Sequence, residues 1–314
     1  MISGEKVLIT GATGSIGLPL ALHLAKENEV WGVARFAQRR PPGEPPTAGS
    51  RAELDAAGVT TRALDLGDGD FSELPDDFTY VLHLSWMRAD LAHLEQALRT
   101  NVEGAGLLLQ HCRKAKAALV MSGMGVYTGN ADPWHAYTET DPMGRGATAY
   151  APTSPASKLG VEAVARLCAR AFDLPVVITR LNTFMGTPAS FPAMHIAAVH
   201  EGRPMLAPHD PNPHTPTHLD DMVQQLEPLL DAASTPALVV NWCGDEVVTA
   251  QEWMAEAGRL SGKAPQLVVR PPDPGSPTGT VADPTRRRAI TGPCTSDFWS
   301  SFRDLHTTMT KGQP

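Results

Sequence analysis

The stretch Thr10-Gly-Ala-Thr-Gly-Ser-Ile-Gly17 decides how this chain folds. It follows Lys6–Thr10, an apolar and β-branched run that is typical of a buried strand. It precedes residues 16–28, in which isoleucine and leucine recur at helical spacing. A strand, a glycine-rich turn and an amphipathic helix in that order predict a dinucleotide-binding site.

The glycines of this turn have separate predicted roles. Gly11 and Gly14 permit a tight turn and a close approach of the backbone to a pyrophosphate, and Gly17 permits close packing of the helix on the strand. The amide groups at the start of that helix would face the phosphates. The predicted cofactor-binding residues of the turn are Gly11, Thr13, Gly14, Ser15, Ile16 and Gly17.

Apolar runs and helical patterns alternate along the rest of the chain. Strands are expected at Val30–Val33, Val59–Leu64, Tyr80–Leu84, Ala118–Ser122, Val176–Thr179 and Leu238–Trp242. Helices are expected at Ala92–Thr100, Val102–Lys114, Pro155–Ala171, Asp220–Ala232 and Ala250–Leu260. The alternation predicts an α/β fold, a Rossmann-like doubly wound parallel sheet with a smaller C-terminal substrate-binding region.

The length of 314 residues suits one nucleotide-binding domain and a smaller region beside it. We expect an NADP-binding Rossmann domain over residues 1–180, with contributions from about 217–245. The substrate-binding region is expected over residues 181–216 and 246–314.

Charge and composition argue against several classes of partner. The net charge is −8 and the basic residues form no dense patch, so we expect neither nucleic acid nor a membrane as partner. The first strand begins within ten residues of Met1, so we expect a cytoplasmic protein without a signal peptide. Four widely spaced cysteines suit free thiols, and no metal is expected at His209, His214 and His218. The oligomeric state stays open.

The residue after the second strand indicates which dinucleotide is bound. In a doubly wound sheet this position meets the adenosine ribose, where an acidic residue would bind the 2′-hydroxyl of NAD. The chain has Arg35 there, with Arg39 and Arg40 close behind. A guanidinium group can fork onto a phosphate, so NADPH is the expected cofactor and NADH the alternative.

Seven short segments follow one another in order: Asp65-Leu66, His83-Leu84-Ser85, Asn101-Val-Glu-Gly, Met121-Ser122 through Val126-Tyr127, Ser157-Lys158-Leu, Arg180 to Gly186 and His218-Leu-Asp-Asp221. Together they resemble the extended, epimerase-like branch of the short-chain dehydrogenase/reductase family over nearly the whole chain. The cofactor contacts that this resemblance implies are Asp65, Leu66, Leu84, Ser85 and Lys158.

The chain departs from this family at the residue that protonates the product. The resemblance implies a tyrosine four residues before the lysine, one helical turn away, but Ser154 stands there. The assisting serine aligns with Gly123 or with Ser122. A serine hydroxyl is too weak an acid to act unaided. The candidate catalytic residues are Lys158, Ser122, Ser154 and, as a displaced acid, Tyr150.

The predicted substrate region is apolar and poor in cations. Its candidate substrate-binding residues are Trp86, Met87, Met124, Phe184 and Met185. Large ring systems pack well on such side chains. Between Arg180 and Arg259 the only lysine or arginine is Arg203, and His214 stands where nucleotide-sugar enzymes of this branch carry an arginine. A weakly charged, polycyclic small molecule is therefore the expected substrate.

These features predict an NADPH-dependent ketoreductase that acts on a polycyclic aromatic natural product. It would be similar to the ketoreductases that lack the tyrosine and act in the biosynthesis of angucyclinone antibiotics. Angucyclinones are aromatic polyketides. Lys158 would hold the cofactor, Ser122 would polarise the carbonyl, and a phenol of the substrate would supply the proton. Water, Tyr150 and Tyr127 are the other proton sources. Two alternatives stay open: a non-catalytic NADP(H)-binding sensor or scaffold protein, and a sugar-nucleotide epimerase or dehydratase.

Overall fold

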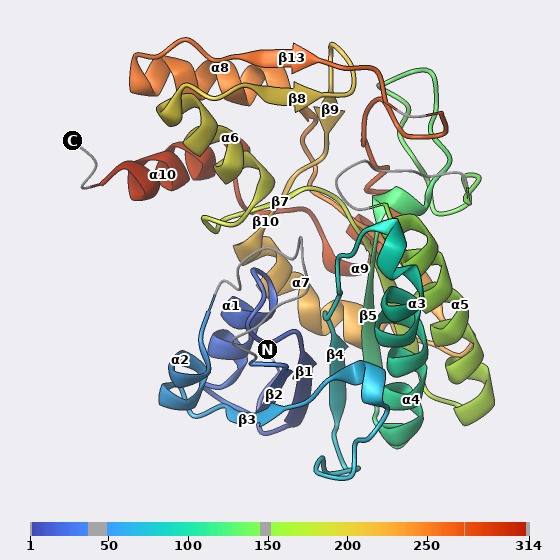
Figure 1. Cartoon of the computed structure of the whole chain (residues 1–314). Coiled ribbons are helices and arrows are strands. Elements are labelled where there is room, and N and C mark those ends of the chain that lie inside the picture. Colours follow the sequence, from blue (N-terminus) through green and yellow to red (C-terminus); the bar gives the residue numbers. More distant parts are fainter. Residues whose placement is uncertain (1, 37–48, 145–151, 273, 312–314) are drawn as a thin grey trace. The chain divides into compact units, whose positions relative to one another are not determined.

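The computed structural model describes residues 2–36, 49–144, 152–272 and 274–311 (Figure 1). The chain divides into two compact units. Unit 1 comprises Met1–Val126, Thr148–Arg180 and Gln225–Val240, and unit 2 comprises Tyr127–Ala147, Leu181–Gln224 and Asn241–Pro314. The segment Tyr127–Ala147, which the sequence-based division assigned to the Rossmann domain, thus belongs to unit 2.

Unit 1 is built around a seven-stranded sheet with the strand order β11-β6-β5-β4-β1-β2-β3 (Figure 1). The strands are β1 (Lys6–Thr10), β2 (Glu29–Ala34), β3 (Thr60–Ala63), β4 (Tyr80–His83), β5 (Ala117–Gly123), β6 (Val176–Leu181) and β11 (Leu238–Trp242). The pairs β1–β2, β2–β3, β1–β4 and β4–β5 are parallel. The order reverses between β1 and β4, which confirms the predicted Rossmann-like, doubly wound fold.

Helices pack against this sheet because its strands bury apolar side chains. The helices of unit 1 are α1 (Gly17–Leu24), α2 (Arg51–Ala56), α3 (Leu94–Leu98), α4 (Gly104–His111) and α5 (Ser154–Phe172), and α7 (Leu219–Asp231) begins in unit 2 and ends in unit 1. One core cluster joins Leu8 and Val81 of the strands to Leu108 of α4 and Val161 of α5. Pro155 lies in the first turn of α5, where its missing N–H costs no helical hydrogen bond.

A π-helical turn, Arg99–Glu103, separates α3 from α4. The sequence predicted a break between two helices at this point but not its form. Asn101, in the middle of this turn, binds the backbone of Met87 through its side chain. Its Oδ1 accepts a hydrogen bond from the Met87 amide at 2.7 Å, and its Nδ2 donates to the Met87 carbonyl at 2.8 Å. The turn thus fixes the loop that follows β4.

Unit 2 consists of helices and short paired strands. The helices are α6 (Phe191–Glu201), α8 (Ala250–Ser261), α9 (Thr285–Thr291) and α10 (Phe298–Thr310). The strand pairs are β7 (Phe184–Met185) with β10 (Thr217–His218), β8 (Met205–Ala207) with β13 (Leu267–Val269), and β9 (Pro213–His214) with β12 (Val248–Thr249). Phe298, Phe302 and Leu305 of α10 are buried in the core of unit 2, so the C-terminal helix packs against this unit.

Unit 1 also has short helical turns, Leu66–Asp68, Leu91–His93 and Met124–Val126. Across the described ranges, no helix combines the length and the apolar composition that a bilayer crossing requires.

Candidate functional site

The glycine turn of unit 1 is packed so tightly that side chains would not fit. A Cβ atom at Gly17 would lie 2.2 Å from the Gly11 carbonyl oxygen, and one at Gly11 would lie 2.9 Å from the Cα of Ser85. Gly11 also has a φ of +69°, in the left-handed region that favours glycine. The Gly14 amide donates to the Gly11 carbonyl at 2.8 Å and closes the turn. This compact cradle before α1 fits a pyrophosphate.

The other predicted residues of the turn contribute in different ways. Thr13 is buried, and its carbonyl accepts a hydrogen bond from the Gly49 amide at 3.1 Å. Ser15 is half-buried, and Ile16, which caps α1, is buried. Ser15 is therefore the side chain of these three that a ligand can reach most readily.

Thr10 connects the glycine turn to the loop after β4. It lies opposite His83 in the β1–β4 register. Its hydroxyl accepts a hydrogen bond from the Ser85 amide at 3.2 Å and shares another with His83 Nδ1 at 3.0 Å. Burial, together with the positive charge of Lys158, lowers the pKa of His83 to about 3, so this imidazole is neutral near neutral pH. The two loop segments predicted to contact the cofactor are thus held side by side.

Lys158 lies on α5 with its ammonium group buried. The Nζ atom donates to the carbonyl oxygen of Met121 on β5 at 2.8 Å and lies 5.3 Å from the centroid of the Trp86 ring. Burial lowers the pKa of Lys158 to about 8, and the charge of Glu162 opposes this effect. The lysine therefore carries its proton at neutral pH and loses it under mildly alkaline conditions.

Ser122 has a different setting from the one predicted. Its hydroxyl donates to Glu162 at 2.7 Å, and Glu162 also binds Arg180 through Nε at 2.9 Å and Nη2 at 2.8 Å. All three side chains are buried. The expectation that Ser122 polarises a carbonyl disagrees with this geometry, because the Ser122 hydroxyl proton points to the Glu162 carboxylate. This carboxylate joins α5 to β5 and β6.

Ser154 is the first residue of α5, one turn before Lys158, and it is half-buried. The preceding Thr153 donates through its hydroxyl to the Ala89 carbonyl at 2.9 Å, which anchors the start of the helix. Tyr150, the predicted displaced acid, lies outside the described residues.

At the predicted adenosine end, Arg35 follows β2 and is half-buried. The structure brings a further arginine to this point, because the Arg51 guanidinium lies 5.4 Å from the ring centroid of Phe36. Arg51 also donates through Nε to Thr61 at 2.9 Å. Arg51 was not predicted for this site, since it starts a separate helix. The predicted residues Arg39 and Arg40 lie outside the described ranges.

Asp65 and Leu66 follow β3 and begin the helical turn Leu66–Asp68. Asp65 accepts a hydrogen bond from the Gly67 amide at 2.9 Å and so caps that turn. The Leu66 side chain belongs to the core cluster of unit 1, so only its backbone can contact a cofactor. Leu84 is buried, whereas Ser85 is half-buried.

The predicted substrate-binding residues fall into both units. In unit 1, Trp86 is half-buried, Met124 is buried, and Met87 is packed in a small core cluster with Ala89 and Ala97. The Met87 side chain thus serves packing, in contrast to the expectation that it contacts substrate. In unit 2, Met185 is in the core and Phe184 is half-buried.

Comparisons with known proteins place the chain among relatives. A model of the NAD dependent epimerase/dehydratase family matches residues 7–236. The chain belongs to this family. A search of curated proteins found no match.

Several solved structures of similar fold are complexes with sugar nucleotides or enzymes named for acting on them. MoeE5 in complex with UDP-glucose and NAD is 22% identical with a TM-score of 0.77, and the match covers 98% of this chain and 100% of that one. UDP-glucuronic acid 4-epimerase from Bacillus cereus is 21% identical with a TM-score of 0.78, covering 97% and 99%. UDP-glucose 4-epimerase from Thermotoga maritima is 17% identical with a TM-score of 0.81, covering 98% and 100%. At these identities the likeness shows a shared fold.

In this epimerase/dehydratase family member, His214 of unit 2 is a buried and neutral residue. Its Nδ1 lies 2.8 Å from the Thr183 hydroxyl and 2.7 Å from the Thr280 hydroxyl, and its Nε2 donates to Asn212 Oδ1 at 3.0 Å. Burial, aided by the nearby His195, lowers the pKa of His214 to about 3. It therefore carries no charge at neutral pH with which to bind a phosphate.

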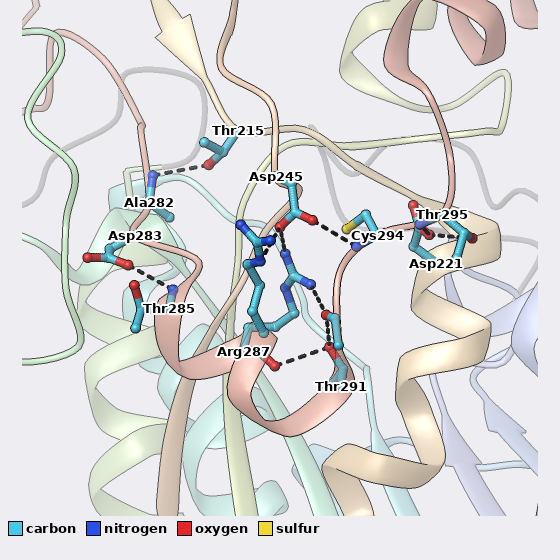
Figure 2. A network of polar contacts seen from close by, with 12 residues as sticks. Thr215, Asp221, Asp245, Ala282, Asp283, Thr285, Arg287, Thr291, Cys294 and Thr295 are labelled. Carbon is cyan, nitrogen blue, oxygen red and sulfur yellow. Dashed lines mark hydrogen bonds and ion pairs between the residues drawn. The ribbon is translucent and has the colours of Figure 1, made fainter.

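Asp221 and Asp245 have partners within unit 2 (Figure 2). Asp221 accepts from the amide of Thr295 at 2.7 Å, and Asp245 accepts from the buried guanidinium of Arg287 and from the Cys294 amide at 2.8 Å. A neighbouring cavity of about 60 Å³ is too small for a dinucleotide or a polycycle. Among the described residues, no three His, Cys, Asp or Glu side chains are grouped to hold a metal ion.

Proposed function

We propose that this family member is an NADPH-dependent ketoreductase that reduces a carbonyl of a polycyclic aromatic compound. The observation that carries the proposal is the start of α5, where Lys158 is retained and buried but the residue one turn before it is Ser154. A family enzyme with this arrangement keeps its nicotinamide site and lacks a phenol at the usual place.

The residues present suit a dinucleotide. The tight glycine cradle of Gly11, Gly14 and Gly17 would hold the pyrophosphate, and Arg35 with Arg51 would favour a 2′-phosphate on the adenosine ribose. Lys158 would donate to the ribose of the nicotinamide. When bound, the reduced nicotinamide supplies the hydride.

The proton then needs a source other than Ser154. Hydride addition to the carbonyl carbon moves the C=O electron pair onto oxygen, which must gain a proton to become the alcohol. A phenol beside the carbonyl is already hydrogen-bonded to it, transfers its proton to that oxygen and becomes a resonance-stabilised phenolate. Water then returns a proton to the phenolate. The balance is one hydride and one proton added to the ketone.

The scarcity of cations between Arg180 and Arg259 supports a substrate of low charge. Arg203, the only lysine or arginine between Arg180 and Arg259, is paired with Glu201 at the surface. Buried His214 is neutral. A diphosphate would thus find little fixed positive charge among these residues.

NADPH oxidation with a peri-hydroxytetralone, followed by absorbance, tests the proposal. The methyl ether of the same ketone is the matched control, because it keeps the carbonyl and removes the acidic proton. We expect turnover of the phenol and at least about a 100-fold lower rate with the ether, as for loss of a general acid. The variants Ser154→Ala and Tyr150→Phe should retain turnover. A large loss with Tyr150→Phe alone would contradict substrate assistance and make Tyr150 the acid.

Two other functions give different results in the same assay. Family membership favours a sugar-nucleotide epimerase or dehydratase, which would convert UDP-glucose or a related sugar nucleotide without net NADPH oxidation. A sensor or scaffold protein would bind NADPH but would not oxidise it, whichever ketone is added.

A further inference from the structure

We infer that the indole N–H of Trp86 donates a hydrogen bond to the carbonyl oxygen that is reduced. The inference rests on the proposed ketoreductase function and names a residue that the family comparison does not. Family members would stabilise the developing oxyanion with a tyrosine and a serine, but this chain has Ser154 and Gly123 at two of the aligned positions. Trp86 would supply part of that stabilisation.

The first observation is an unsatisfied donor. The Nε1 atom of Trp86 is buried and has no hydrogen-bond partner among the described residues. An indole nitrogen only donates, so it needs an acceptor, and leaving it without one is unfavourable in a buried position. Lys158, which lies over the same ring, is also only a donor and does not satisfy it.

The second observation is the place of Trp86 in unit 1. It follows β4 directly after Ser85, whose Cα lies against Gly11 of the glycine turn. On its other side the ring lies 5.3 Å from Lys158 Nζ. Trp86 thus stands between the predicted pyrophosphate cradle and the predicted nicotinamide ribose contact, at the end of the dinucleotide where the reaction takes place.

The chemistry of indole matches the proposed reaction. An indole N–H is far too weak an acid to protonate an alkoxide, but it stabilises negative charge on oxygen as hydride arrives. The substrate phenol still provides the proton. The donor and the acid are thus separate groups.

Trp86→Phe tests this role because it keeps an aromatic ring beside Lys158 and removes only the N–H. Trp31→Phe is the matched control, since Trp31 lies on β2 of the same unit and its indole nitrogen already donates to Glu29 at 2.8 Å. With NADPH and the peri-hydroxytetralone, we expect Trp86→Phe to lower kcat by about 10- to 100-fold with a nearly unchanged Kd for NADPH. Trp31→Phe should keep the wild-type kcat.

A binding measurement separates failure of this inference from failure of the proposed function. Tryptophan residues are labelled with ¹⁵N, and the Trp86 indole resonance is assigned by its absence from the Trp86→Phe spectrum. This resonance should move downfield when the tetralone is added to the protein with NADP⁺. NADP⁺ has no hydride to transfer, so the ketone is bound without turnover. A shift with NADP⁺ alone would show that Trp86 binds the cofactor and would overturn the inference, as would no shift at all. If wild-type protein oxidises NADPH and Trp86→Phe does so equally well, the function stands and the inference fails. If no ketone is reduced, the proposed function fails and the inference fails with it.

Discussion

Units 1 and 2 use the polar residues of their motif segments in opposite ways. In unit 1, the glycine cradle has no room for side chains, and the Trp86 indole nitrogen has no hydrogen-bond partner among the described residues. In unit 2, His214, Asp221 and Asp245 are taken up by hydrogen bonds within the unit itself. A match to a family motif therefore does not by itself show whether a polar residue serves a ligand or the fold.

The contrast is not complete, because unit 1 also has a structural polar network. Glu162 joins Ser122 on β5 to Arg180 on β6 and lies one turn after Lys158 on α5. We interpret this network as the support that holds Lys158 against β5. The following predictions test whether each polar group supports the fold or the chemistry.

The largest effect is expected for Glu162→Gln. It removes the carboxylate charge that pairs with the buried guanidinium of Arg180, which should lower the free energy of unfolding by about 3–5 kcal/mol. Denaturant unfolding measures it. Ser122→Ala removes one hydrogen bond and should cost about 1 kcal/mol. If instead Ser122→Ala left stability unchanged and abolished turnover, the serine would be catalytic as first predicted.

Lys158→Met should reduce kcat/KM for NADPH by about 100-fold, or roughly 2.7 kcal/mol, because it removes the proposed ribose contact. The wild-type rate should also fall as pH rises through the lysine pKa of about 8, since the ammonium form is present below that value. Steady-state rates across the pH range measure both. Exposed Lys114→Met is the control, and an equal loss in that variant would refute a specific role for Lys158.

The fold was largely predictable because its signals are local. The alternating apolar runs gave the strands of the sheet and α5, α7 and α8 to within a few residues. The site was less predictable, because the sequence does not say where a side chain points. The Ser122 hydroxyl binds Glu162, and the Met87 side chain enters a core cluster. Arg51 meets Phe36 only through the three-dimensional fold.

His214 should make the protein less stable in acid. Its pKa is about 3 in the folded state and near 6.5 when unfolded, so the unfolded state gains a proton first and stability falls as pH decreases below about 6.5. Between pH 6.5 and 5 this single group should cost about 2 kcal/mol. Unfolding of His214→Gln, compared with wild type at both values, should show a smaller pH dependence. An unchanged dependence would mean that folding leaves the pKa of His214 near its unfolded value of about 6.5, so that the imidazole could gain a charge at mildly acidic pH.

The smallest effect concerns the choice of cofactor. Arg35→Asp replaces the residue after β2 with the acid that would bind the 2′-hydroxyl of NAD, so the ratio of kcat/KM for NADPH to that for NADH should fall by at least about tenfold, or roughly 1.4 kcal/mol. Arg51→Ala should lower NADPH affinity less, because Arg51 is also bound to Thr61. Arg170→Ala, in the last turn of α5, is the control. If Arg35→Asp left the ratio unchanged while Arg51→Ala reduced it, Arg51 of α2 would be the residue that binds the 2′-phosphate. Arg35, the residue after β2, would then not determine the cofactor preference of this family member.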